Sequence, residues 1–359
     1  MISGGGTGGH IYPAISIAQA LQEMLQEVEI LFVGAKGKME MEKVPKAGFK
    51  IEGLWISGIQ RRLSGQNLLF PAKLLSSLLG ASRLIKSFKP DVVVGVGGYA
   101  SGPLLYVATK KGVPTLIQEQ NSYAGLTNKL LAKSVNKICV AHDGMEKYFP
   151  KDKIVITGNP VRSTIKLNNN RKGEAYQYFE LDATKPTLLV VGGSLGARSV
   201  NEFILAGLER FEQQGIQLIW QCGGFYYEEM KERSKGKGGV VVLKDFIFQM
   251  DFAYGVADVV ISRAGALSIA ELMLTGKPSI LVPSPNVAED HQTINALALV
   301  EKEAAEMVKD SEAMDKLVEE AIALLNDAQR REKLAKNIRA MSHEHAAMDI
   351  ANEVMKLVE

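Results

Sequence analysis

The stretch Asp91-Val92-Val93-Val94-Gly95-Val96-Gly97-Gly98 decides the fold, because it joins a short apolar strand pattern to a glycine loop. A second stretch, Asp258-Val259-Val260-Ile261-Ser262-Arg263-Ala264-Gly265, follows the same plan, and a helical pattern comes after each. Valine- and isoleucine-rich strands that alternate with helices are typical of βαβ units and parallel sheets. The sequence therefore predicts an α/β protein in which one architecture occurs twice.

Three further pairs of segments support a duplication. Ligands of open parallel sheets bind beyond the carboxyl ends of the strands. We therefore expect two Rossmann-like parallel-sheet domains that face one another across a cleft, at residues 1–163 and 164–340, with a break near Gly158-Asn159-Pro160. The paired segments are residues 4–9 and 192–196 (glycine loops), 112–117 and 276–281 (helix stop and buried strand), and 118–122 and 284–292 (polar loops).

Composition is consistent with this plan. The 359 residues suit two domains rather than one core. The two cysteines, Cys139 and Cys222, suit a reducing compartment better than a disulfide framework. No basic, apolar leader opens the chain, so we expect no secretion. Glycines and a proline interrupt the uncharged run at residues 92–109, which argues against a membrane span there.

Charge is distributed unevenly between the halves. Through residue 165 there are 20 Lys and Arg against 11 Asp and Glu, and after it there are 22 against 29. A basic first half favours an anionic partner there, either a phosphate or a lipid headgroup. A chance imbalance of surface charge is the open alternative.

The first glycine loop ends at His10, and we expect a helix at residues 11–23 after it. Glycines let backbone N–H groups approach a phosphate or sugar at the start of a helix. No acidic residue ends the second strand, so the loop is not the dinucleotide fingerprint. An imidazole titrates near neutrality, so His10 is a candidate general base for a hydroxyl. The other interpretation is that it only bonds the loop backbone.

The second half carries two motifs at strand ends. Ser194, in the loop Gly192-Gly193-Ser194-Leu195-Gly196, can donate to a diphosphate, and no P-loop lysine follows the glycines. In the other motif, Gly265 and Ala266 leave room for a ligand at a helix start. Glu271 lies within that helix, where it either accepts two ribose hydroxyls or is an ordinary surface glutamate.

Two polar loops, Glu119-Gln120-Asn121 and Asp290-His291-Gln292, correspond in the two halves. Amide side chains suit sugar recognition because each both donates and accepts. The sequence contains no Asp-X-Asp triplet and no His/Cys cluster with metal spacing, so we expect no metal. A departing diphosphate would then depend on helix N-termini, Ser194 and a cationic side chain.

Residues 61–89 mix leucines with cations. Such a helix can attach reversibly to an anionic membrane surface, although most of its leucines are expected in the core. The residues are Leu74, Leu75, Leu78 and Leu79, with Arg61, Arg62, Lys73, Arg83, Lys86 and Lys89 around them.

An ordered set of motifs covers essentially the whole chain. Its members are residues 4–10 with Pro13, 97–103, 119–121, 158–162, 192–197 and 262–266. Any one of these loops is weakly specific, but together and in this order they resemble the MurG family, the UDP-N-acetylglucosamine (UDP-GlcNAc) transferases that make lipid II for peptidoglycan.

The resemblance implies a GT-B fold and an inverting transfer without metal or other cofactor. The acceptor would be the muramoyl 4-hydroxyl of lipid I (undecaprenyl-diphospho-MurNAc-pentapeptide), and the protein would be peripheral at the cytoplasmic face of the cell membrane. The final helix, at residues 341–359, would cross back onto the first domain. We expect no nucleic-acid partner.

The resemblance also implies roles for single residues. In the second domain these are the backbone of Ile247 for uracil, Glu271 for ribose, Ser194 with Arg162 for the diphosphate, Ala266, Leu267, Ser268, Ile269 and Ala270 along the nucleotide, and Gln292 for the GlcNAc hydroxyls. In the first domain, Thr7, Gly8, Gly9 and Asn121 would hold sugar or phosphate, His10 would be the leading base candidate, and Tyr99, Ser101 and Glu119 would shape the acceptor pocket.

One departure and three alternatives stay open. Only Met1-Ile2-Ser3 precede the first glycine loop, so either the first strand is very short or the native start lies upstream. The alternatives are a diacylglycerol-type GT-B transferase, a UDP-GlcNAc 2-epimerase and a non-catalytic nucleotide-sugar sensor.

Overall fold

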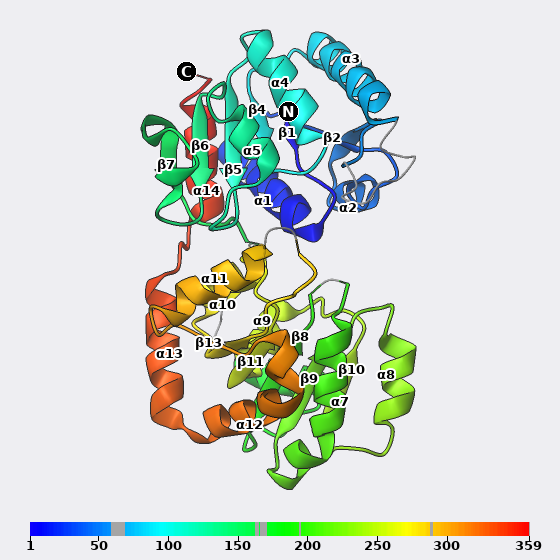
Figure 1. Cartoon of the computed structure of the whole chain (residues 1–359), viewed down its shortest axis with the longest axis vertical. Coiled ribbons are helices and arrows are strands. Elements are labelled where there is room, and N and C mark those ends of the chain that lie inside the picture. Colours follow the sequence, from blue (N-terminus) through cyan, green and yellow to red (C-terminus); the bar gives the residue numbers. More distant parts are fainter. Residues whose placement is uncertain (59–68, 162–164, 166–170, 194, 288–289, 359) are drawn as a thin grey trace. The chain divides into compact units, whose positions relative to one another are not determined.

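A computed structural model describes residues 1–58, 69–161, 165, 171–193, 195–287 and 290–358 (Figure 1). The chain divides into two compact units. Unit 1 consists of Met1–Arg162 together with Glu344–Glu359, and unit 2 of Ser163–His343.

Unit 1 contains a parallel sheet of seven strands in the order β3-β2-β1-β4-β5-β6-β7. The order reverses between β1 and β4, and loops at such a switch point form the usual ligand crevice of an open α/β sheet. The strands are β1 (Ile2–Ser3), β2 (Leu31–Ala35), β3 (Lys50–Leu54), β4 (Val93–Gly95), β5 (Thr115–Glu119), β6 (Lys137–Val140) and β7 (Ile154–Ile156).

Helices cover both faces of this sheet, because alternate strand residues point to opposite sides. Val33 and Val93 belong to the core beneath α3 and α4, whereas Phe32 and Val94 belong to the core with α1 and α14. The helices of unit 1 are α1 (Gly8–Met24), α2 (Glu40–Lys46), α3 (Phe70–Phe88), α4 (Ser101–Lys110), α5 (Leu126–Leu131) and α14 (Ala346–Met355).

The first strand and the first helix are separated by a short loop. β1 has two residues, yet Ile2 pairs with both Phe32 and Val94, so β1 is a central strand. The predicted helix start at residue 11 is wrong: α1 begins at Gly8. Thr7 is extended, with φ −144°, and its carbonyl accepts from the N–H groups of His10 (3.1 Å) and Ile11 (3.2 Å). His10 therefore lies in the first helical turn.

Unit 2 contains a parallel sheet of six strands in the order β10-β9-β8-β11-β12-β13. Its order reverses between β8 and β11, so the plan of unit 1 recurs. The strands are β8 (Thr187–Val191), β9 (Gln217–Gln221), β10 (Val241–Lys244), β11 (Val259–Ser262), β12 (Ser279–Leu281) and β13 (Glu306–Met307).

The helices of unit 2 also cover both faces. Leu188 and Val190 point into the core with α7 and α12, while Leu189 and Val191 point into the core with α6, α9, α10 and α11. The helices are α6 (Lys172–Phe179), α7 (Arg198–Gln213), α8 (Tyr227–Ser234), α9 (Met250–Val256), α10 (Ala266–Thr275), α11 (His291–Val300), α12 (Ala313–Asn326) and α13 (Ala328–Ala340).

The C-terminal tail contains two helices, α13 and α14. α13 ends at Ala340 and α14 begins at Ala346, so the expected helix at 341–359 is shorter than predicted. α14 belongs to unit 1, where it packs against α1 (Figure 1). Ile350 and Val354 of α14 share a core with Ile11 of α1.

Two further features bear on the expectations. No helix within the described ranges is long and apolar enough to cross a lipid bilayer. Cys139 and Cys222 are buried free thiols. Burial raises the pKa of Cys139 to about 12 and that of Cys222 to about 11, so both are protonated at neutral pH.

Candidate functional site

Two glycine loops meet at the switch point of unit 1. The loop after β1 contains Gly5, and the loop after β4 contains Gly97 and Gly98. The Gly5 N–H donates to the Gly97 carbonyl at 3.3 Å. Gly97 and Gly98 have φ of +98° and +91°, and a Cβ on Gly98 would lie 2.4 Å from the Gly5 oxygen. Only glycine lets the two loops approach this closely.

His10 lies against this pair of loops. A Cβ on Gly97 would lie 2.6 Å from Cδ2 of His10, so the missing side chain makes room for the ring. Nδ1 of His10 is 3.1 Å from the Gly5 carbonyl and 3.3 Å from Oγ1 of Thr7. A carbonyl only accepts, so in this bond Nδ1 carries the proton, and in the neutral ring Nε2 then carries the lone pair. His10 can therefore bond to the Gly5 carbonyl through Nδ1 and still act as a base through Nε2.

Glu119, at the end of β5, organises its own loop. Its Oε1 accepts from the backbone N–H and Nδ2 of Asn121 (3.1 and 3.3 Å), and its Oε2 accepts from the Gly125 N–H (2.9 Å) and Nδ2 of Asn128 (2.8 Å). The side chain is 2% exposed. Glu119 therefore fixes the loop that contains Asn121.

The residues expected at the acceptor pocket after β4 differ in exposure. Tyr99 is half exposed and lies beside Gly58 and Gly6. Ser101 is fully buried because, as the first residue of α4, it turns inward onto Gly95 of β4. Ser101 therefore belongs to the packing between the start of α4 and β4.

A buried glutamate that the sequence analysis missed supports the first loop. Glu40, at the start of α2, is 1% exposed, and its oxygens accept from the N–H groups of Gly6 (2.8 Å) and Ala35 (3.0 Å). A Cβ on Gly5 would lie 2.2 Å from Oε1 of Glu40. No local sequence signal pairs Glu40 with a loop more than thirty residues away.

The glycine loop after β8 occupies the switch point of unit 2. Gly193 and Gly196 have φ of +88° and +77°, and a Cβ on Gly196 would lie 2.1 Å from the Cys222 carbonyl at the end of β9. Nε2 of Gln221 donates to the Gly193 carbonyl at 3.0 Å. The loop is thus packed onto the neighbouring strand end. Ser194 lies outside the described residues, as does Arg162.

Helix α10 begins at the other side of this switch point. Gly265 is its N-cap, so the N–H groups of its first turn, at residues 266–268, have no carbonyl partner within the helix. Such a turn attracts anions. Glu271 follows one turn later, and its Oε2 accepts from the Tyr254 hydroxyl at 3.0 Å. The carboxylate is therefore held by a buried tyrosine that the sequence analysis missed.

The remaining donor-side candidates follow β10 and β12 in the chain. The Ile247 side chain is 4% exposed and belongs to the core of unit 2, so only its backbone can serve a ligand. Gln292, in the first turn of α11, accepts from the Ser284 N–H at 2.9 Å through Oε1. Its Nε2 is the end that can donate to a sugar hydroxyl.

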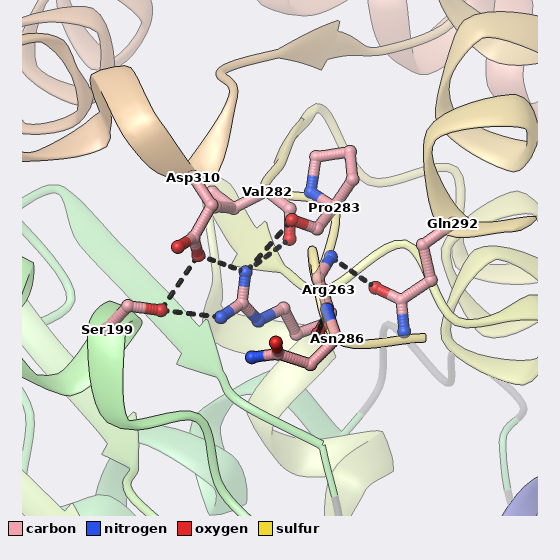
Figure 2. Close-up of polar contacts among 8 residues, drawn as sticks. Ser199, Arg263, Val282, Pro283, Asn286, Gln292 and Asp310 are labelled. Atoms are coloured by element: carbon pink, nitrogen blue, oxygen red, sulfur yellow. Dashed lines mark hydrogen bonds and ion pairs between the residues drawn. The ribbon is translucent and has the colours of Figure 1, made fainter. Parts of the chain in front are cut away.

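Arg263, directly after β11, joins four segments of unit 2 (Figure 2). Nη1 donates to the carbonyls of Val282 (3.0 Å) and Pro283 (3.1 Å) and to Oδ1 of Asp310 (2.6 Å), and Nη2 donates to Oγ of Ser199 (2.7 Å). Ser199 also donates to Asp310 at 2.7 Å. At 8% exposure, this arginine fixes the loops around the switch point rather than reaching into solvent.

The exposed face of α3 differs from the sequence expectation. Most of its leucines were expected in the core, but Leu74, Leu75 and Leu79 are 36%, 61% and 53% exposed. The buried face of α3 is instead lined by Ser77, Ala81 and Ile85, one turn apart. Arg83, Lys86 and Lys89 are exposed at the C-terminal end of the helix. Arg61 and Arg62 lie outside the described residues.

Within the described residues, the predicted site residues follow the carboxyl ends of parallel strands, at one edge of the sheet in each unit. Thr7, Gly8, Gly9 and His10 form the start of α1. The loop at Tyr99 packs against the loop before α1, and Asn121 follows β5 at the same sheet edge. In unit 2 they are Ile247, Gln292 and the first two turns of α10, which contain Ala266, Leu267, Ser268, Ile269, Ala270 and Glu271.

Comparison with known proteins identifies both units. Residues 1–140 match the N-terminal domain of glycosyltransferase family 28, and residues 187–354 match its C-terminal domain. The UDP-N-acetylglucosamine–N-acetylmuramyl-(pentapeptide) pyrophosphoryl-undecaprenol N-acetylglucosamine transferase of Cytophaga hutchinsonii is 54% identical over 100% of this chain and 96% of its own. The protein of the same name from Parabacteroides distasonis is also 54% identical, over 100% and 98%.

Solved structures agree with the sequence relatives. The crystal structure of Acinetobacter baumannii MurG matches with a TM-score of 0.79 and 28% identity, over 99% of this chain and 98% of that one. A UDP-N-acetylglucosamine 2-epimerase matches with a TM-score of 0.66 at 12% identity, which shows a shared fold alone. The predicted GT-B class, with two parallel-sheet domains, is confirmed. The chain belongs to glycosyltransferase family 28.

Proposed function

We propose that this protein transfers GlcNAc from UDP-GlcNAc to the muramoyl 4-hydroxyl of undecaprenyl-diphospho-MurNAc-pentapeptide, giving lipid II for peptidoglycan. The observation that carries the proposal is the identity of 54%, over the whole chain, to transferases whose names state this donor sugar and this acceptor. The arrangement of each switch point supports it.

Unit 2 has the features of a donor site. The N-terminus of α10, after its N-cap Gly265, carries the positive end of the helix dipole, which would attract the negative charge of a diphosphate. Glu271, held by Tyr254, has carboxylate oxygens suited to ribose hydroxyls. The other proposed contacts are the Ile247 backbone with uracil, Ser194 and Arg162 with the diphosphate, Ala266, Leu267, Ser268, Ile269 and Ala270 along the nucleotide, and Gln292 with GlcNAc.

Unit 1 has features suited to both substrates: Thr7, Gly8, Gly9 and Asn121 are proposed to hold sugar or phosphate of UDP-GlcNAc, and Tyr99, Ser101 and Glu119 to shape the acceptor pocket. Thr7, Gly8 and Gly9 offer backbone and hydroxyl groups at the start of α1, and Asn121 offers an amide from the loop that Glu119 fixes. Tyr99 presents an exposed ring and hydroxyl beside the first loop. Glu119 and Ser101 act by shaping these loops, because both side chains are buried.

The tautomer of His10 suits it to act as general base. As the acceptor oxygen attacks the anomeric carbon of GlcNAc, its proton passes to Nε2 of His10. The bond between the anomeric carbon and the diphosphate oxygen breaks, and UDP leaves with the electron pair. Attack from the face opposite the leaving group inverts the anomeric configuration. The developing charge on UDP is stabilised by helix N–H groups and cationic side chains of the donor site.

We further propose that the protein works as a peripheral protein at the cytoplasmic face of the cell membrane. The exposed leucines of α3 give an apolar surface, and Arg83, Lys86 and Lys89 lie beside it. Apolar contact combined with basic residues gives reversible attachment to anionic lipid. An acceptor carried by a polyprenyl chain would then be reached at the membrane surface.

A transfer assay tests the proposed reaction. UDP-GlcNAc and a lipid I analogue are incubated with the protein in the presence of EDTA, and formation of the disaccharide lipid is followed by mass spectrometry. We expect product with the chelator present. Two control reactions are run. In one, diacylglycerol replaces lipid I as the acceptor, and in the other, UDP-GlcNAc is incubated with the protein alone to test for epimerisation. Product in either control, without product from lipid I, would refute the proposal.

A further inference from the structure

Glu40 and His10 bond to opposite ends of one peptide group. The carbonyl of Gly5 and the N–H of Gly6 belong to the same planar amide. Its oxygen lies 3.1 Å from Nδ1 of His10, and its N–H donates to Oε2 of Glu40 at 2.8 Å. A continuous path of hydrogen bonds therefore runs from a buried carboxylate, through a single amide, to the imidazole.

The site is built to hold this path. Glu40 is 1% exposed, and its second oxygen accepts from the Ala35 N–H at 3.0 Å, so both oxygens act as acceptors, as in an ionised carboxylate. A Cβ added to Gly5 would lie 2.2 Å from Oε1 of Glu40, and a Cβ added to Gly34 would lie 2.6 Å from Cγ of Glu40. Glycine at both positions leaves the volume that the carboxylate occupies.

Hydrogen bonds in series strengthen one another, because each polarises the group that makes the next. A negative carboxylate on the Gly6 N–H increases the partial negative charge of the Gly5 oxygen. That oxygen then holds the Nδ1 proton more firmly and stabilises a positive imidazole. The effect on Nε2 resembles that of a carboxylate bonded directly to Nδ1.

We propose that Glu40 is a positioning residue for His10: through the Gly5–Gly6 amide it fixes the Nδ1-protonated tautomer and makes Nε2 a stronger base. This inference rests on the proposed role of His10 in transfer. It assigns a function to a glutamate that contacts neither substrate nor imidazole.

Other ionisable groups on elements packed against the start of α1 have different partners. Both oxygens of Glu119 are occupied within its own loop. Tyr99 packs against Gly58 and Gly6. On α14, Glu353 pairs with Lys356. Of these groups, Glu40 is the one that accepts a hydrogen bond from the amide that His10 contacts.

A double-mutant cycle on turnover tests the proposal. Glu40→Gln removes the charge, and we expect kcat to fall on the order of tenfold in the native background. In a His10→Ala background the same change should cost less than about twofold, because the base it supports is gone. Glu42→Gln, an exposed glutamate on the same helix, is the matched control and should leave kcat unchanged. Equal losses from Glu40→Gln in both backgrounds would mean a purely structural role.

A histidine titration by NMR separates this inference from the proposed reaction, because it needs no activity. We expect the pKa of His10 to be lower in Glu40→Gln than in the native protein, and unchanged in Glu42→Gln. Glu40→Asp, which keeps the charge, should recover part of the shift. An unchanged His10 pKa in a folded Glu40→Gln protein would overturn the proposal, even if transfer to lipid I were confirmed.

Discussion

The guanidinium of Arg263 bonds to partners on three other segments of unit 2, at Ser199, at Val282 and Pro283, and at Asp310, so its loss should affect all of them. The ion pair of the buried Arg263 with the partly buried Asp310 is supplemented by hydrogen bonds from Arg263 to Ser199 and two carbonyls. Removing one partner of a buried pair costs about 3–5 kcal/mol, because a buried charge is left uncompensated. We expect Arg263→Ala to lower the free energy of unfolding by about that amount, measured by urea denaturation.

Substitution of Arg263 should also weaken the use of UDP-GlcNAc. Arg263→Lys keeps the charge but cannot reach Ser199 and the carbonyls together. We expect its KM for UDP-GlcNAc to rise about tenfold, or about 1.4 kcal/mol. Arg210→Ala, which removes an exposed pair with Glu319, is the control and should change stability by less than about 1 kcal/mol. An Arg263→Lys protein with native KM would contradict the positioning role.

Glu271 makes a second prediction at the same scale. If its carboxylate accepts ribose hydroxyls, Glu271→Ala should weaken UDP binding about 10- to 100-fold, since a hydrogen bond to a charged group contributes about 1.5–3 kcal/mol. The measurement is calorimetric titration with UDP. Tyr254→Phe removes the buried bond to the same carboxylate and should weaken binding much less. Unchanged affinity in Glu271→Ala would remove it from the ribose site.

At the scale of a single element, we predict that helix α3 attaches the protein to anionic membranes. Each basic residue near an anionic leaflet contributes about 1 kcal/mol of attraction, so reversing Arg83, Lys86 and Lys89 to Glu should abolish most sedimentation with phosphatidylglycerol vesicles. Neutral vesicles should bind both proteins equally weakly. The matched control reverses Lys231, Lys235 and Lys237 on and after α8. Equal loss in the control would mean that net charge, and not α3, governs attachment.

Helices and strands could be predicted where the local sequence pattern alone determines them. The strands at Asp91 and Asp258, each with a glycine loop and a helix, revealed the duplicated sheet, because period and turn residues are local signals. The leucines of α3 were misjudged, since periodicity shows a stripe but not which stripe faces the core. There, the small residues Ser77 and Ala81 pack inward, and the leucines remain outside.

The residues that hold the loops of the site in place, such as Glu40 and Arg263, could not be predicted from local sequence patterns. Glu40 reaches Gly6, and Arg263 reaches Asp310, only because the sheet topology brings distant segments to one strand end. The loops named from sequence were those whose glycines and polar residues lie together in the chain. Residues that hold those loops from elsewhere leave no local pattern, and they became evident only from the fold.

At the scale of the whole molecule, the chain leaves unit 1 at residue 162 and returns to it at residue 344. Ile350 of α14 is fully buried against α1, the helix whose first turn carries His10. Ile350→Ala should cost about 2–5 kcal/mol of the stability of unit 1, as expected for a large-to-small change in a core. Asn352→Ala, on the exposed side of α14, is the control.

Each unit has its own cores, so calorimetry should distinguish their responses. UDP at a hundredfold excess over its Kd should add about 2.7 kcal/mol to the unit that binds it. If unit 2 holds the donor, UDP should raise one transition of the Ile350→Ala protein and leave the lowered transition of unit 1 in place. Turnover should then fall with temperature along the unit 1 transition, while UDP binding persists. A single transition that UDP restores completely would show that the two units unfold together, and the C-terminal helix would then stabilise the protein as a whole.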